Sequence, residues 1–386
     1  MQPSVTTTPA TSPATSSATS PATDPATPPG STVPALADLT TLRVGGPATQ
    51  YVETTTEREL IDAVRAADDA GEPLLVVGGG SNLLVADAGF DGVVVRDVRT
   101  GIDVPDHSAC AGVTYTVPAG TPWDEVVEEA VTHRLVGLEA LSGIPGSTGA
   151  TPVQNVGAYG QEVAQTISTV RVWDRGRGRV RTLPLVDLRF GYRTSLLKRS
   201  MRAVDPDDPR SPWHPTPRYV VLDVTFQLRQ GTTTRSVDYP ELARVLGVGV
   251  GERAPILDVR AAVLELRGRK GMVLDASDHD TWSAGSFFTN PVLAEGEVPE
   301  GAPRFPAPDG LVKTSAAWLI EHSGFSRGFG APGPAALSDK HTLALTNRGG
   351  ASASDLVALA RQVRDGVAAR FGVTLEPEPV LVGVSL

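Results

Sequence analysis

The chain has 386 residues, of which 40% are hydrophobic, so it is long enough for two or three domains with sizeable cores. Its formal net charge of -10 argues against a general binder of nucleic acid or of anionic membranes, because both need a basic surface. The single cysteine, Cys110, cannot form an intramolecular disulfide, and no cysteines or histidines have metal-ligand spacing. We therefore expect a cytoplasmic protein with no metal and no membrane span, since no run approaches the ~18 apolar residues that a spanning helix needs.

The N-terminal stretch differs from the rest of the chain. Up to about Pro34 it is almost entirely threonine, serine, proline and alanine, without the basic residues and apolar run of a signal peptide. We predict that it is a disordered tail. Further on, Thr56 and Glu59 form a capping-box signature, and a helical face of apolar residues follows until Gly71 and Pro73 end the helix.

A glycine loop follows this helix. Two short apolar runs flank three glycines, a serine and an asparagine at residues 78–82, which predicts a strand, a tight loop and a strand. Because glycine has no Cβ, successive N–H groups can converge there, and such a nest suits a phosphate or diphosphate. The loop matches neither the dinucleotide fingerprint nor the P-loop, since no lysine follows and Leu83 and Leu84 continue as a strand. An ordinary turn is the alternative.

A second glycine-rich segment covers residues 138–160. Its glycines recur among small residues, which indicates a close approach of the backbone to a neighbouring strand or to a ligand. Between the two glycine segments, residues 92–95 and 115–117 are predicted strands, and Thr121 with Pro122 is predicted to cap and open a helix.

The rest of the chain mixes predicted strands and helices. Residues 373–378 are expected to return as an extended segment after Gly372 ends the last helix, and residues 205–217 form a proline-rich insertion. The predicted strands are residues 170–173, 180–183 and 220–226, and the predicted helices lie around residues 259–266, 316–322 and 355–371.

Three stretches carry polar groups that packing alone does not require. The planar fork of Arg193 could clamp a carboxylate, although an exposed loop arginine is the alternative. Ser286 lies between a glycine and two phenylalanines without the Gly-x-Ser-x-Gly elbow of a hydrolase, so its hydroxyl either passes a proton or belongs to an ordinary aromatic turn. Prolines hold Glu376 and Glu378 in defined directions, although such a pair is also common on solvated edges.

Taken in order, these stretches resemble the UDP-N-acetylenolpyruvoylglucosamine reductases, flavoenzymes of bacterial cell-wall precursor synthesis. The resemblance covers roughly Leu39 to Gly383. The tail has no counterpart in it, the insertion at residues 205–217 is longer than the family pattern requires, and neither touches a matched motif. Six motifs in the family's order carry the resemblance, namely residues 41–46, 78–82, 144–146 with 154–160, 190–193, 284–291 and 375–378.

The resemblance implies an α+β fold, with a two-subdomain FAD-binding module of the vanillyl-alcohol-oxidase type followed by a smaller α/β substrate-binding domain. The expected divisions are a tail over residues 1–36, the FAD-binding domain over 37–250, and a C-terminal domain over 251–386 whose last strand returns to the active site. FAD would lie between the two subdomains. The residues expected to hold it are Gly78, Gly79, Gly80, Ser81, Asn82, Ile144, Gly146, Gly157, Ala158 and Tyr159.

The implied activity is the NADPH-dependent reduction of the enolpyruvyl ether of UDP-N-acetylglucosamine to UDP-N-acetylmuramate, for peptidoglycan synthesis, cell shape and division. Arg193 matches the arginine that holds and polarises the enolpyruvyl carboxylate, and Ser286 matches the proton donor. Glu378 matches the assisting carboxylate, although Glu376 is close enough in sequence to confuse the assignment. The expected substrate contacts are Tyr192, Tyr239, Arg267, Lys270 and Asn290.

Two alternatives belong to different classes of protein. A flavin oxidase of alcohols or sugars should lack the Ser286 and Glu378 motifs, which are present. A sugar-nucleotide binding protein without catalysis should lack Arg193, Ser286 or Glu378, and all three are present. The expected partners are therefore the enolpyruvyl sugar nucleotide and NADPH, with no nucleic acid and no membrane.

Overall fold

The structure is a computed structural model, and it describes Met1 and residues 33–108 and 112–386. The predicted disordered tail lies almost wholly outside these residues, as does Cys110. Regular structure begins with the short helix α1 (Leu36–Leu39).

A small parallel sheet in the order β1-β4-β2 forms the first layer. Helix α2 (Glu57–Ala70) packs on it, and its predicted capping box is confirmed. The Thr56 hydroxyl accepts a hydrogen bond from the N–H of Glu59 at 3.1 Å, and the Glu59 carboxylate accepts one from the N–H of Thr56 at 3.1 Å. The strands are β1 (Ala48–Thr54), β2 (Leu74–Val77) and β4 (Phe90–Asp97).

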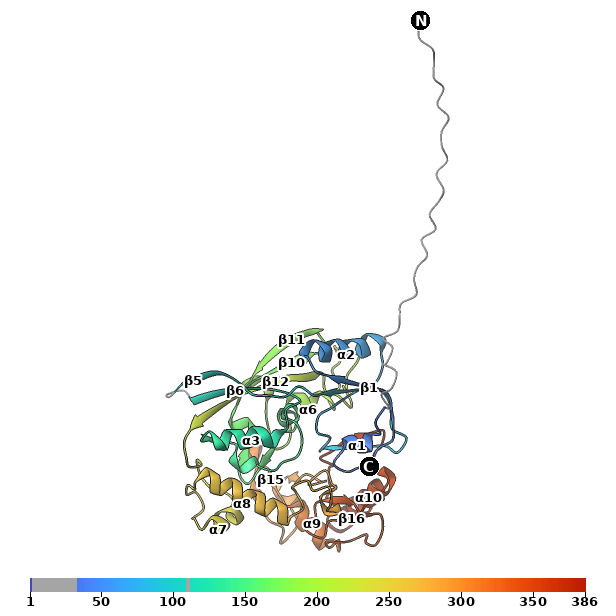
Figure 1. The fold of residues 1–386 in the computed structure, drawn as a ribbon. Coiled ribbons are helices and arrows are strands. Elements are labelled where there is room, and N and C mark those ends of the chain that lie inside the picture. The colour runs from blue at the N-terminus through green and yellow to red at the C-terminus, as the bar shows by residue number, and fades with distance from the viewer. Residues whose placement is uncertain (2–32, 109–111) are drawn as a thin grey trace. The chain divides into compact units, whose positions relative to one another are not determined.

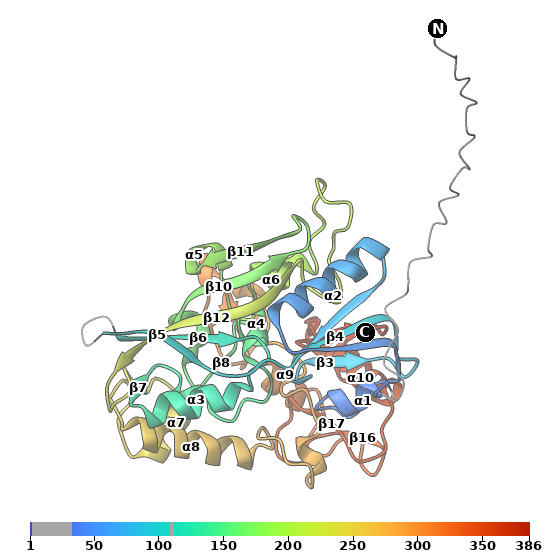
Figure 2. The ribbon, with the colours of Figure 1, turned by 45° about the horizontal axis from the view of Figure 1, so that its top comes forward.

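A larger antiparallel sheet in the order β11-β10-β12-β6-β5 forms the second layer, with β7 paired to the end of β12. The buried faces of α2 and β4 meet Trp173, Val220 and Leu222 of this sheet, so α2 lies between the two sheets (Figure 2). The strands are β5 (Asp103–Ser108), β6 (Gly112–Pro118), β7 (Leu135–Val136), β10 (Ile167–Asp174), β11 (Arg179–Pro184) and β12 (Tyr219–Gln230).

Helix α3 (Trp123–Thr132) covers the other face of the larger sheet, where Trp123 packs on Phe226 with ring centroids 5.8 Å apart. The helix was predicted, but the cap assigned to Thr121 is wrong. The Thr121 hydroxyl donates to the carbonyl of Gly101 at 3.2 Å instead, and Pro122 occupies the N-cap position without a side-chain bond to the helix.

Short elements connect these layers around the second glycine-rich segment. None of them exceeds five residues, and the insertion at 205–217 contains only turns and irregular backbone. They are α4 (Thr151–Gln154), β8 (Gly157–Ala158), β9 (Gln161–Glu162), α5 (Leu185–Leu188) and α6 (Leu196–Ser200).

The C-terminal part of the chain combines helices with small two- and three-stranded sheets and long irregular connections (Figure 1). Helices α7 and α8 share one buried cluster, so the predicted domain boundary after Val250 falls between two packed helices and stays a prediction. The helices are α7 (Pro240–Leu246), α8 (Ile256–Arg269), α9 (Ala316–His322) and α10 (Ala353–Phe371). The strands are β13 (Val292–Leu293), β14 (Phe305–Pro306), β15 (Val312–Lys313), β16 (Ala335–Leu337) and β17 (Leu345–Asn347).

The end of the chain returns to the glycine loop. Strand β18 (Val380–Val382) pairs in parallel with β3 (Leu83–Val85), the strand that directly follows the loop. This pairing fixes the segment that precedes β18 beside the loop. Among the described residues, no helix is long and apolar enough to cross a membrane.

Candidate active site

The glycine loop joins β2 to β3, as predicted, and it is packed tightly against two other segments. A Cβ on Gly78 would lie 2.0 Å from Ser147 Oγ, one on Gly79 would lie 2.6 Å from Gly146 Cα, and one on Gly80 would lie 1.8 Å from the carbonyl oxygen of Leu39. The loop therefore needs glycines in the first place because the neighbouring protein segments leave no room for a Cβ.

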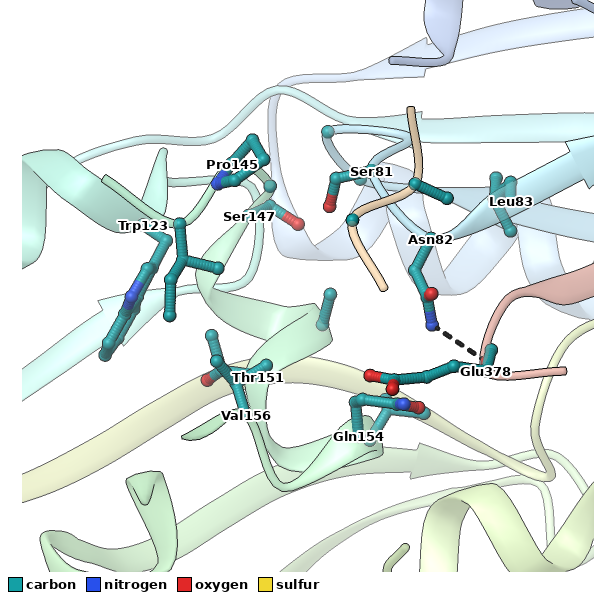
Figure 3. A pocket seen from close by; sticks show the side chains of 18 of the residues that line it. Ser81, Asn82, Leu83, Trp123, Pro145, Ser147, Thr151, Gln154, Val156 and Glu378 are labelled. Atoms are coloured by element: carbon teal, nitrogen blue, oxygen red, sulfur yellow. Dashed lines mark hydrogen bonds between the residues drawn. The ribbon is translucent and has the colours of Figure 1, made fainter. Parts of the chain in front are cut away.

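The backbone amides of this loop are free to bind a ligand. Residues 79–82 donate no hydrogen bond from their backbone N–H groups to any other described residue, and neither do Gly146 and Ser147 on the facing segment. The hydroxyls of Ser81 and Ser147 point toward the same space (Figure 3). Converging N–H groups and hydroxyls suit the diphosphate of a dinucleotide such as FAD, so the residues present fit this cofactor.

Replacing Gly80 with alanine should weaken FAD binding, because its Cβ would collide with a fixed carbonyl and such overpacking costs about 1–3 kcal/mol or more. The dissociation constant of FAD from the apoprotein measures the effect. Gly178→Ala is the matched control, since Gly178 has a φ of +58° against +60° for Gly80, with nothing within 4 Å of its Cβ position. Unchanged FAD affinity in Gly80→Ala would contradict the packing argument.

The cavity beside this loop has a volume of about 530 Å³, which is typical of a site for a small ligand. The structure brings all the sequence-predicted site residues to its wall. These are Gly78, Gly79, Gly80, Ser81, Asn82, Ile144, Gly146, Gly157, Ala158, Tyr159, Tyr192, Arg193, Tyr239, Arg267, Lys270, Ser286, Asn290 and Glu378.

Arg193 is held against the second glycine-rich segment. Its guanidinium donates to the carbonyls of Asn155 at 2.9 Å and Gly157 at 2.5 Å, and its Nε lies 3.9 Å from a carboxylate oxygen of Glu378. The backbone φ of Arg193 is +101°, a conformation that non-glycine residues rarely adopt and that costs about 1–3 kcal/mol. Strain of this kind clusters at functional sites, which supports a role for Arg193 beyond packing.

Glu378 is fixed from three sides by its backbone. Its N–H donates to the carbonyl of Phe287 at 2.8 Å, and its carbonyl accepts hydrogen bonds from Asn82 at 3.4 Å and from Lys198 at 3.3 Å (Figure 3). The glycine loop is thus tied to the carboxylate through Asn82. Glu376, the competing candidate, does not line the cavity but a neighbouring groove.

Ser286 reaches the same wall through the pairing of its segment with the chain end. Phe287 accepts the hydrogen bond from Glu378, Phe288 bridges to Pro377, and the half-buried Ser286 side chain lines the cavity. No hydrogen bond joins the Ser286 hydroxyl to another residue in the described part of the chain. This hydroxyl is therefore available to a substrate.

A basic and aromatic group lines another part of the cavity. Tyr159 and Tyr239 meet edge to face at 5.3 Å, and Lys270 lies 5.6 Å from the Tyr159 ring centre while it pairs with Glu241 at 2.5 Å. Burial lowers the pKa of Arg267 to about 10, and its Nη2 donates to the carbonyl of Met272 at 2.7 Å. The predicted substrate contact Lys270 is therefore already paired with Glu241, which the sequence motif did not indicate.

The predicted substrate contacts Tyr192 and Asn290 belong to one small network. The Tyr192 hydroxyl accepts a hydrogen bond from the N–H of Asn290 at 3.3 Å, and Lys313 lies 4.5 Å from the Tyr192 ring centre. The Asn290 side-chain oxygen accepts from the N–H of Ala316 at 2.9 Å, at the start of α9. The N-terminal end of that helix is thereby attached to the cavity wall.

Sequence reasoning missed several polar residues at or near this site, of which Gln154, His341 and Lys198 bear most on its chemistry. Gln154 and His341 line the cavity, and burial lowers the pKa of His341 to about 4, so its imidazole is neutral at pH 7. Lys198 is only 6% exposed and lies behind the wall, and burial lowers its pKa to about 8. A lysine five residues after Arg193, directly after the apolar pair Leu196 and Leu197 and three residues after the N-cap Ser195, was the available signal.

Comparisons with known proteins agree with this geometry. Residues 48–184 match the family model described as an FAD binding domain, and residues 277–382 match the model described as the C-terminal domain of UDP-N-acetylenolpyruvoylglucosamine reductase. The chain is 53% identical to the UDP-N-acetylenolpyruvoylglucosamine reductase of Cutibacterium acnes over 359 residues, which covers 92% of this chain and 91% of that protein. The chain belongs to the UDP-N-acetylenolpyruvoylglucosamine reductases.

A second relative and a solved structure are also similar to this chain over about nine tenths of its length. The reductase of Thermobifida fusca is 50% identical over 364 residues, covering 91% of this chain and 97% of that protein. The crystal structure of the reductase from Thermus caldophilus aligns with a TM-score of 0.59 at 27% identity, covering 90% of this chain and 97% of that one. The predicted α+β fold with an FAD-binding module is therefore confirmed.

Proposed function

We propose that this reductase uses NADPH and FAD to convert the enolpyruvyl ether of UDP-N-acetylglucosamine to UDP-N-acetylmuramate, for peptidoglycan synthesis in the cytoplasm. One observation carries the proposal. The cavity lined by the glycine loop also presents Arg193, Glu378 and Ser286, three groups with no need to meet for packing. We also propose that this product serves cell-wall synthesis, and through it cell shape and cell division.

The proposed roles follow from the chemistry of each side chain. FAD, when bound, supplies a ring that accepts hydride from NADPH and delivers it to the vinyl carbon of the substrate. Hydride addition places negative charge on the carboxylate side of the double bond, where the fixed guanidinium of Arg193 stabilises it. The Ser286 hydroxyl then donates a proton to the adjacent carbon, and Glu378 assists beside Arg193.

The remaining polar residues are proposed to hold the two alternating substrates. Lys270, Arg267 and Tyr239 would contact the sugar nucleotide, because cations and hydroxyls suit its phosphates and sugar. Tyr192 and Asn290 would line the enolpyruvyl end, since both lie next to Arg193 or to the Ser286 segment. Among the described residues, no group of three or more acidic, histidine or cysteine side chains could hold a metal ion.

Anaerobic stopped flow tests the proposal directly. The purified protein should be yellow, NADPH should bleach the flavin, and the enolpyruvyl sugar nucleotide should restore its colour without oxygen. The alternative, an oxidase of alcohols or sugars, predicts reduction of the flavin by such a substrate and reoxidation by oxygen. A protein that cannot be loaded with flavin would overturn both functions.

A further inference from the structure

Lys198 is a buried cation without an acidic partner. Its ammonium donates to the side-chain oxygen of Gln154 at 2.5 Å and to the carbonyl of Glu378 at 3.3 Å, and it forms no ion pair with a carboxylate in the described part of the chain. Burying an ammonium is costly unless its hydrogen bonds are made. A lysine at this position therefore needs a reason beyond packing.

Gln154 supplies the second observation. It lies at the end of α4, lines the cavity, and is 8% exposed, and its Nε2 is buried without any hydrogen-bond partner among the described residues. A lysine ammonium donates only, so the oxygen of the amide must face Lys198 and the NH2 group must face away from it. Figure 3 shows the amide end of Gln154 on the same side of the pocket as Glu378.

An unsatisfied buried donor costs about 1–3 kcal/mol, and an acceptor on a molecule bound in the cavity that Gln154 lines would remove this cost. NADPH and the sugar nucleotide occupy the cavity in turn under the proposed function, whereas FAD stays through the whole cycle. Only FAD can therefore accept a hydrogen bond from Gln154 Nε2 throughout the catalytic cycle. The ring end of FAD offers carbonyl oxygens, on which negative charge increases when the ring is reduced.

We propose that Gln154 donates a hydrogen bond from Nε2 to a carbonyl oxygen of the flavin ring, and that Lys198 is a positioning residue that fixes the amide in this orientation. The donor and the charge behind it stabilise the reduced ring more than the oxidised ring. The pair therefore raises the reduction potential of the bound flavin. This inference rests on the proposed flavin chemistry.

The midpoint potential of the bound flavin, measured by anaerobic titration of the holoenzyme, tests the inference. Gln154→Leu should shift the equilibrium about tenfold toward the oxidised ring, which is about 30 mV for a two-electron couple. Lys198→Met should shift the potential in the same direction by at least as much, because the amide is released and a charge is lost. Gln154→Glu keeps an acceptor for Lys198 but loses the donor, and it should lower the potential further.

Arg202→Met is the matched control. Arg202 is an exposed cation four residues from Lys198 that does not line the cavity, so its removal should leave the potential unchanged. Thermal unfolding and the FAD dissociation constant of each variant separate this effect from misfolding, and the glutamate variant serves if the leucine variant does not fold.

Two results would overturn the inference. One is an unchanged or raised midpoint potential in Gln154→Leu or Gln154→Glu. If the potential is unchanged and only reoxidation by the sugar nucleotide slows, the Gln154 amide binds the substrate and not the flavin. The other is an equal shift in Arg202→Met and Lys198→Met, which would reduce the effect to charge alone. A wild-type protein without flavin would instead contradict the proposed function, so the two failures are distinguishable.

Discussion

Arg193→Ala should leave the reduction of the flavin by NADPH nearly intact and slow its reoxidation by the enolpyruvyl substrate by about 10²–10³-fold. The guanidinium is held in place by the carbonyls of Asn155 and Gly157, so it needs no rearrangement when charge develops on the substrate carboxylate. NADPH has no carboxylate at its reacting end, and its hydride transfer should not depend on this group. The two half-reactions can be followed separately by anaerobic stopped flow at the flavin absorbance.

Arg189→Ala is the matched control for this variant. Arg189 belongs to the same loop, has a φ of +46° and is exposed, and it does not line the cavity. Alanine at position 193 keeps the Cβ and hence the backbone strain, so a selective effect reports the guanidinium. Arg193→Lys should recover only part of the rate, because an ammonium lacks the planar fork. Equal damage to both half-reactions would point to misfolding and would count against the proposed role.

The glycine loop illustrates how far the sequence alone could predict this site. The apolar runs on either side of residues 78–82 predicted the strand, loop and strand correctly, because that pattern is local. The neighbours of the glycines were not predictable in the same way. Leu39 and Ser147 lie about 40 and 70 positions away in the sequence, and only tertiary packing brings them to the loop.

Lys198 and Glu378 are two further residues whose positions in the site no local sequence pattern reveals. Glu378 was found because its motif matched a family, although nothing local distinguished it from Glu376. In the structure, Glu378 lines the cavity, with its backbone bound by Phe287 and Asn82, whereas Glu376, whose carbonyl accepts from Thr289, lines the neighbouring groove. Lys198 was missed because a lysine is usually exposed, and its burial depends on the contact with Gln154 that no local pattern encodes.

The misassigned cap of α3 has a related cause. A threonine followed by proline is a frequent helix start, but the Thr121 hydroxyl is used by the carbonyl of Gly101. The Thr121 carbonyl also accepts from the N–H and the hydroxyl of Thr148, both at 2.8–2.9 Å. These bonds tie α3 to the segment that faces the glycine loop. A residue that looks like a local cap thus stabilises the cavity wall.

Ser286→Ala should have an effect of comparable size, with reduction of the flavin by NADPH unchanged and reoxidation by the enolpyruvyl substrate slowed by about 10²–10⁴-fold, the usual contribution of a positioned proton donor. The Ser286 hydroxyl lines the cavity without a hydrogen bond to another described residue, so its removal leaves no buried partner unsatisfied and should not destabilise the fold. Unfolding temperatures of the two proteins check this expectation.

Two companion variants make the test of Ser286 specific. Thr289→Val removes a hydroxyl three residues further on, which lines the neighbouring groove and bonds weakly to the Glu376 carbonyl at 3.4 Å, and it should leave both half-reactions unchanged. Ser286→Cys keeps a donor at the same atom position and should recover part of the lost rate. The solvent isotope effect on reoxidation should change in Ser286→Ala, because the proton must then come from another source. If reoxidation by the substrate is equally fast in wild type and Ser286→Ala, the proton reaches the substrate from another group, and the hydroxyl only lines the cavity.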